Sequence, residues 1–298
     1  MSRTMVEPPT RPYLTASIST RETTLFAYRF MLRSLGAIVR LVWLPTLIQI
    51  LILYISLNVY LLELATFLQQ PDSQIAGQAL GILVGGIFGA LFFAGIAIVA
   101  IVELASGNQS KPGWVYLRIS RIEWRFYAAA VRLFIILVSF VAIAVAVFWG
   151  VANTLDISPT GTVFWLGNAA LIMGMFYLFL RLGFLIPPLA VAQSEKILRR
   201  CWRLTAQSVW SLAPIMLVLI IPGIALQIAA EFFLRVGGMI PAPALGFSLN
   251  DFAVAGHGIL PYALLVMMVS YLAVVVPLTV GAVVVHRTLA EREEGKHP

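Results

Sequence analysis

Charged residues and cysteine are scarce in this chain. Only 11% of its 298 residues are Asp, Glu, Lys or Arg, whereas 60% are hydrophobic. An ordinary soluble domain carries about a quarter of charged residues. So few charges cannot cover the surface of a soluble protein of this size, and lipid is therefore the expected solvent. The single cysteine, Cys201, excludes a disulfide framework and any cysteine-based metal site.

Motifs for catalysis and for metal or nucleotide binding are lacking as well. The three histidines, His257, His286 and His297, are too far apart in sequence to suggest a ligand set. A zinc-protease motif, which places two histidines one helical turn apart, does not occur. The sequence therefore predicts a non-enzymatic protein without a cofactor. The basic residues behind the net charge of +7 lie next to apolar segments, which favours membrane lipids over nucleic acid as partners.

Six long apolar segments dominate the rest of the chain. Each can cross a hydrocarbon core of about 30 Å, which takes about 20 helical residues. Helices are expected because lipid cannot satisfy open backbone groups. The segments lie at 38–62, 79–104, 128–152, 163–190, 211–232 and 259–285. We therefore predict an all-α membrane protein with a six-span domain at 24–290, between a mobile cytoplasmic tail at 1–23 and a second one at 291–298.

The distribution of basic residues predicts the orientation of the six spans. Of the 20 Lys and Arg residues, six lie in the first 40 positions, five at 111–132, four at 196–203 and three after position 286. The loops on the other side hold only Arg235, and Arg181 lies within a span. The positive-inside rule then places both termini in the cytoplasm. The predicted location is the bacterial inner membrane.

Basic, aromatic stretches precede the first, third and fifth spans. Such stretches are typical of amphipathic helices that lie in the membrane interface, so we predict three interfacial helices on the cytoplasmic side. The spacing also favours three repeated helical hairpins, although a basic character shared by all inner loops gives a similar pattern. The arginines expected to contact lipid headgroups are Arg118, Arg121, Arg125, Arg199, Arg200 and Arg203.

Small residues recur at steps of four in the second span, at Gly81, Gly85 and Gly89. Such a ladder lets another helix approach closely. We expect these glycines to pack inside the bundle, and a dimer interface is the alternative. Gly85→Leu is then expected to destabilise the protein, and Gly107→Leu, in a loop, is not.

Arg181 is the one arginine inside a long apolar segment, six residues before the Pro187-Pro188 pair. An ionisable residue within a span is a candidate functional site, and its expected partner is Glu103 at the end of the second span. Prolines cannot donate a backbone hydrogen bond, so Pro187 and Pro188 should break the helix and free carbonyls near Gly183. A structural Arg181–Glu103 clamp is favoured, and a transport or ligand site at the same two residues is the alternative.

The stretch around Arg181 resembles a known sequence pattern. The pattern is R-x5-PP-x6-E-x7-W-x-L-T, carried here by Arg181, Pro187, Pro188, Glu195, Trp202, Leu204 and Thr205. It is similar to that of a bacterial family of six-helix inner-membrane proteins, related to the membrane domain of some glycerophosphodiester phosphodiesterases. The family usually has a glycine and a serine where Lys196 and Cys201 stand here. The resemblance implies a six-span fold and an undefined role, and no phosphodiesterase barrel accompanies it.

These observations predict a non-enzymatic inner-membrane protein of undefined molecular role, a structural or accessory component in lipid or envelope homeostasis. The alternative is a transporter or lipid-handling protein with a site near Arg181 and Glu103, and a third, less favoured one is a membrane-bound enzyme. The first two hypotheses differ in whether the interior of the bundle is filled or holds a polar cavity.

The predicted topology can be tested with single cysteines in a Cys201→Ser background. An impermeant thiol reagent added to sealed cells should label cysteines at Ser73, Thr160 and Ser248 because these positions lie outside. Cysteines at Ser17 and Ser110 should stay unlabelled. Labelling of the second set in sealed cells would overturn the topology.

Overall fold

The structure of the protein is a computed structural model that describes residues 19–69, 73–107, 116–154, 162–206, 208–236, 268–269 and 271–294. Within these ranges the regular structure is entirely helical, and six helices are long and apolar enough to cross a membrane. They lie at Leu35–Glu63, Gln74–Ala105, Arg121–Phe148, Trp165–Val191, Val209–Leu226 and Tyr271–Glu291. The predicted all-α fold with six candidate spans is confirmed. The start of the predicted sixth segment, 259–267, lies outside the described residues.

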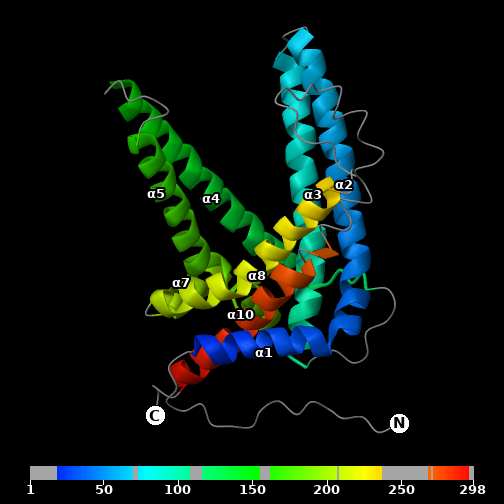
Figure 1. The fold of residues 1–298 in the computed structure, drawn as a ribbon, viewed down its shortest axis with the longest axis vertical. Helices are drawn as coiled ribbons and strands as arrows, with labels where there is room; N and C mark the ends of the chain where they lie inside the picture. The colour runs from blue at the N-terminus through cyan, green and yellow to red at the C-terminus, as the bar shows by residue number, and fades with distance from the viewer. Residues whose placement is uncertain are drawn as a thin grey trace.

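Two long helical hairpins rise from one end of the molecule and diverge (Figure 1). The first consists of α2 (Leu35–Gln69) and α3 (Ser73–Ala105), which pack along each other more extensively than any other pair of elements. The second consists of α4 (Arg121–Thr154) and α5 (Thr162–Leu178). Helix α5 packs mainly against α4 and the π-helix that follows it, so it stands apart from the rest of the fold, whereas α4 also packs on α3.

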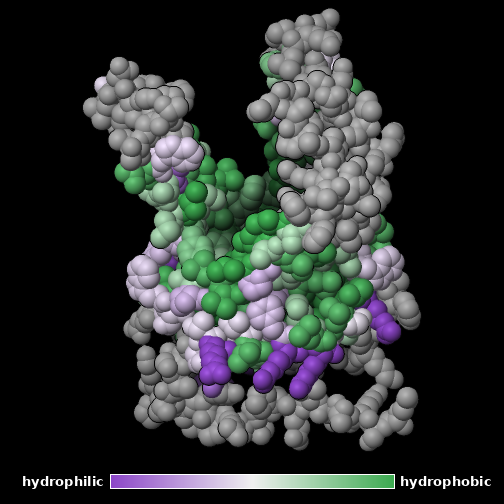
Figure 2. Space-filling view, viewed as in Figure 1, coloured by the Kyte–Doolittle hydropathy of each residue, from purple (hydrophilic) through white to green (hydrophobic). Residues whose placement is uncertain are grey.

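Four further elements pack together at the end from which the hairpins rise: α1 (Thr20–Arg33), α8 (Val209–Val236), η2 (Tyr271–Val275) and α10 (Val276–Glu294). Helix α1 lies across this end and packs on α10 and α8 (Figure 1). The Tyr28 hydroxyl donates a 3.0 Å hydrogen bond to the Leu219 carbonyl of α8. The π-helix η2 leads into α10. We call this end the basic end, because α1 and α7 (Ile197–Thr205) bring several arginines to it; Figure 2 shows hydrophilic side chains gathered there.

The hydrophobic core is concentrated at the basic end. Its fully buried members include Ile38 of α2, Ile101 of α3, Leu189 of α6 (Ile186–Val191), Leu212 of α8 and Val280 of α10. In the 18-residue apolar stretch of the α4 span only 6% of residues are buried, against 50% in that of the last span. The outer parts of the hairpins therefore expose apolar side chains such as Ile143 and Ile172, as expected for surfaces solvated by lipid rather than by water.

The boundaries of two predicted segments differ from the structure. Helix α1 begins at Thr20, inside the predicted tail 1–23, because the Ser19 hydroxyl caps it by accepting from the Glu22 amide at 3.3 Å. Helix α10 continues to Glu294, past the predicted end of the membrane domain. Residues 1–18 and 295–298 lie outside the described part of the chain.

The predicted separate helix before the third span is wrong. Residues 116–120 are non-helical, and Arg121 begins α4 itself. The start is set by a capping box: the Glu123 carboxylate accepts from the Ser120 amide at 2.8 Å, and the Ser120 hydroxyl accepts from the Ile122 amide at 3.2 Å. The S-x-x-E spacing that marks this start is present in the sequence. By contrast, α1 and α7 (Ile197–Thr205) are separate helices next to their spans.

The predicted close packing of another helix against Gly81, Gly85 and Gly89 is not found among the described residues. A Cβ atom added at Gly81 or Gly85 would meet nothing within 4 Å, and one at Gly89 would make only ordinary contact, 3.4 Å from Ile52. The close approach to α2 is at Gly86, where an added Cβ would overlap Ser56 Oγ and Cβ. The expected tolerance of Gly107 to Leu is also wrong, because Gly107 has φ +75°, which favours glycine.

We therefore expect Gly86→Ala to destabilise the protein by about 1–3 kcal/mol, because the Ser56 Cβ is attached directly to the backbone and cannot move aside cheaply. Gly85→Ala is the matched control on the adjacent residue of the same helix and should leave the stability nearly unchanged. Thermal unfolding of the two variants in detergent measures the difference. Equal midpoints for both variants would show that α2 and α3 do not meet at Gly86.

Candidate functional site

The fourth candidate span changes its helix type before it ends. After Leu178 the chain forms a π-helix, η1 (Phe179–Gly183), in which the Phe184 amide donates to the Phe179 carbonyl at 3.0 Å. A short helix, α6 (Ile186–Val191), then begins with Pro187 and Pro188 in its first turn. Proline is tolerated there because the first amides of a helix have no intrahelical acceptor. The proline pair therefore does interrupt the helix, as predicted.

Arg181 lies in η1, is 7% exposed, and stacks on an aromatic ring. Its guanidinium carbon is 3.9 Å from the centroid of Trp202 in α7 and 5.9 Å from that of Tyr177. The Thr205 hydroxyl, which also donates to the Cys201 carbonyl at 2.8 Å, lies 3.1 Å from the Arg181 carbonyl, which accepts from it as well. Among the described residues, the buried Arg181 Nε has no hydrogen-bond partner. Arg181 thus fastens α7 to the broken span.

Glu103 has different partners, and the predicted Arg181–Glu103 clamp is not formed among the described residues. One Glu103 oxygen lies 3.6 Å from Arg118 Nη1, and the other accepts a 3.2 Å hydrogen bond from the Tyr116 hydroxyl. Burial, reinforced by the Glu103 charge, raises the pKa of the Tyr116 hydroxyl, which therefore stays protonated and donates. Glu103 ties the end of α3 to the segment before α4, which is a structural role.

The loop between α6 and α7 contains two residues with left-handed backbones. Gln193 has φ 53°, and the Ser194 amide reaches back to the Leu189 carbonyl at 3.1 Å, which closes α6 in a Schellman motif. Lys196 has φ 51° at the N-cap of α7 and offers no side-chain cap. A left-handed conformation costs a residue other than glycine about 1 kcal/mol. The two residues turn the chain so that α7 runs across the basic end.

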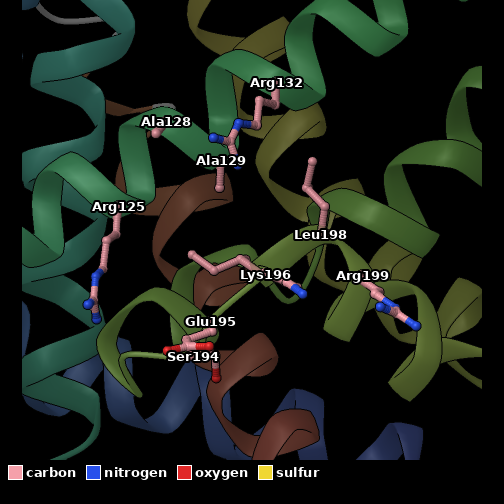
Figure 3. A pocket seen from close by; sticks show the side chains of 10 residues that line it. Arg125, Ala128, Ala129, Arg132, Ser194, Glu195, Lys196, Leu198 and Arg199 are labelled. Atoms are coloured by element: carbon pink, nitrogen blue, oxygen red, sulfur yellow. The ribbon is translucent and has the colours of Figure 1, made fainter.

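An open pocket of about 460 Å³ lies between this loop and the first turns of α4. Figure 3 shows four cations around it: Arg125 and Arg132 extend from α4, and Lys196 and Arg199 from the start of α7. Ser194 and Glu195 line the wall between them. Arg125 Nη1 is held by the Gln193 carbonyl at 3.3 Å, and Arg200 Nη1 donates to the Ser194 hydroxyl at 3.2 Å. We call this site the basic pocket.

The basic pocket carries an excess of positive charge. Of its lining residues only Glu195 is acidic, and within the described part of the chain no ion pair joins any of the four cations to a carboxylate. Like charges gathered at one site repel each other, and an anion in the pocket removes that repulsion. The arrangement is therefore suited to bind phosphate or another anion.

The predicted headgroup arginines divide into two groups. Arg125 and Arg199 line the basic pocket, and Arg200 supports its wall through Ser194. Arg118, Arg121 and Arg203 do not line it. Arg132 and Lys196 were counted among the basic residues but were not singled out as site residues. Contact of these residues with lipid stays a prediction.

No protein-family model, curated protein or solved structure significantly matches the chain. Three of the seven residues that carry the resemblance described above meet in space, since Arg181 contacts both Trp202 and Thr205. The relation to that family stays a prediction.

Cys201 lies on the buried side of α7, and burial raises the pKa of its thiol to about 12. Because the thiolate is the reactive form, Cys201 should resist maleimide in the folded protein at pH 7 to 9 and react only after denaturation. Mass spectrometry of the labelled protein measures this. Rapid labelling of the native protein at pH 7 would contradict the buried position.

Arg181 should be energetically coupled to Trp202 and not to Glu103. We expect a double-mutant cycle of Arg181→Gln with Trp202→Leu, measured by unfolding in detergent, to give a coupling of about 0.5–2 kcal/mol. The matched cycle of Arg181→Gln with Glu103→Gln should give none. A larger coupling energy in the second cycle would contradict this assignment and support an interaction between Arg181 and Glu103.

Proposed function

We propose that the protein is a non-enzymatic integral membrane protein that binds anionic lipid headgroups in the basic pocket and serves an accessory role in lipid or envelope homeostasis. The observation that carries this proposal is the gathering of four cations, without carboxylate partners in the described part of the chain, around one open pocket. We further propose the bacterial inner membrane as its location, with the basic end in the cytoplasm.

The depth of the pocket along α4 supports a lipid ligand. After Arg132, α4 continues through residues 133–154 without a charged side chain. This stretch rises by about 33 Å, close to the thickness of a hydrocarbon core. Arg132 then stands at the boundary of the hydrocarbon, and the pocket lies at the level of the headgroups.

The surface above the pocket supports the same ligand. Ile135 and Ile136 follow Arg132 at the spacing that places residues on one helix face, and they are 53% and 38% exposed. A lipid whose phosphate occupies the pocket can lay its acyl chains along these side chains. The alternative of a transport site at Arg181 and Glu103 loses its support, because the two residues have separate partners.

A matched pair of glycine variants tests the proposal. Lys196→Gly removes a pocket cation and relieves a left-handed backbone, so the protein should keep or gain stability while its affinity for phosphatidylglycerol falls about fivefold, or roughly 1 kcal/mol. Gln193→Gly relieves the other left-handed residue, retains its carbonyl and should leave binding unchanged. Thermal unfolding in detergent with added phosphatidylglycerol or phosphatidylcholine measures both effects. Equal stabilisation by the two lipids, or unchanged binding by Lys196→Gly, would refute the proposal.

A further inference from the structure

We infer that the basic pocket selects a lipid whose headgroup contains two phosphates joined by a glycerol, over a lipid with a single phosphate. This inference rests on the proposed lipid binding and names the ligand class. It follows from the charge of the pocket, from the spacing of its cations and from the start of α7.

The charge balance of the pocket exceeds what one phosphodiester neutralises. Four cations face one carboxylate, which leaves an excess of three positive charges. A headgroup with one phosphodiester carries a single negative charge, whereas a glycerol-bridged pair carries two. The second headgroup therefore leaves less uncompensated positive charge at the site.

The arginines of α4 are spaced for two phosphates. Arg125 and Arg132 are seven residues apart, which places them on one face of α4 and about 10 Å apart along its axis. The Arg125 guanidinium is held at one end of the pocket by the Gln193 carbonyl, and Arg132 lines the pocket further along α4 (Figure 3). A headgroup that reaches both guanidinium groups needs an anionic oxygen at each end.

The start of α7 adds donors on the side of the pocket opposite α4 (Figure 3). Lys196 offers no side-chain cap, so the first amides of this nine-residue helix are available to an anion near Lys196 and Arg199. A bridging glycerol also carries a hydroxyl between its two phosphates. The Glu195 carboxylate and the Ser194 hydroxyl on the same wall are acceptors for that hydroxyl, which gives the single acidic side chain of this anion site a role.

The test compares a diphosphatidylglycerol lipid (cardiolipin) with phosphatidylglycerol at equal total phosphate and with phosphatidylcholine as baseline. Native mass spectrometry of the full chain in detergent measures the affinity of each lipid. We expect cardiolipin to bind at least about tenfold more tightly than phosphatidylglycerol. Either Arg125→Gln or Arg132→Gln should remove this preference, because each variant leaves one phosphate without its guanidinium. Arg29→Gln, which removes an exposed charge of α1 outside the pocket, should retain it.

Each other outcome is decisive. Equal binding of the two anionic lipids per phosphate, or loss of preference in only one of the two pocket variants, overturns the two-phosphate inference and leaves anionic lipid binding in place. Binding of both anionic lipids no tighter than phosphatidylcholine overturns the proposed function as well. If soluble glycerol bisphosphate binds as tightly as the lipid, the pocket recognises free phosphate instead. The arginines are exposed, so folding of the variants is verified by their unfolding midpoints without lipid.

Discussion

The missing amide hydrogens of Pro187 and Pro188 are the constraint on which the basic end depends. Because these residues cannot continue the hydrogen-bond ladder of the fourth span, the helix widens in η1 and restarts as α6. In η1 the Arg181 carbonyl accepts from the Thr205 hydroxyl, and the guanidinium of the same residue covers Trp202. One interrupted helix thus supplies both the anchor for α7 and the loop that forms a wall of the basic pocket.

The sequence was informative about the spans and uninformative about which faces meet. Continuous apolar runs predicted six helices because only a helix satisfies its backbone in lipid. The glycine spacing predicted close packing, yet neighbouring rows of small residues, through Gly85 and through Gly86, differ only in the direction they face. Arg181 and Glu103 were predicted to pair because they carry opposite charges at a similar depth in the membrane, but Arg118 is the cation that lies within reach of Glu103. Tertiary packing decides which face of a helix contacts its neighbour, and the periodicity of the sequence carries no information about that packing.

For the candidate site, the sequence predicted some of the basic residues but not their arrangement around one pocket. The basic character of Arg125 and Arg199 was evident, but their convergence depends on a loop with left-handed residues at Gln193 and Lys196. Neither residue type signals that conformation, since glycine is the usual occupant. The resemblance implied a glycine where Lys196 stands, which agrees with the backbone that the structure has there. The Ser120–Glu123 capping box, by contrast, was readable and would have predicted the start of α4.

The uneven distribution of contacts implies an order of assembly. Within the second hairpin, Gly167 and Gly174 lie directly beneath the rings of Phe148 and Phe140, so its contacts join residues close in sequence. At the basic end, the bond from Tyr28 to Leu219 joins residues 191 positions apart, and α1 packs on α10 from the other end of the chain. Helices that are stable alone in lipid associate in a later step. The hairpins can therefore form during synthesis, whereas the basic end is completed only after the last helix has been inserted.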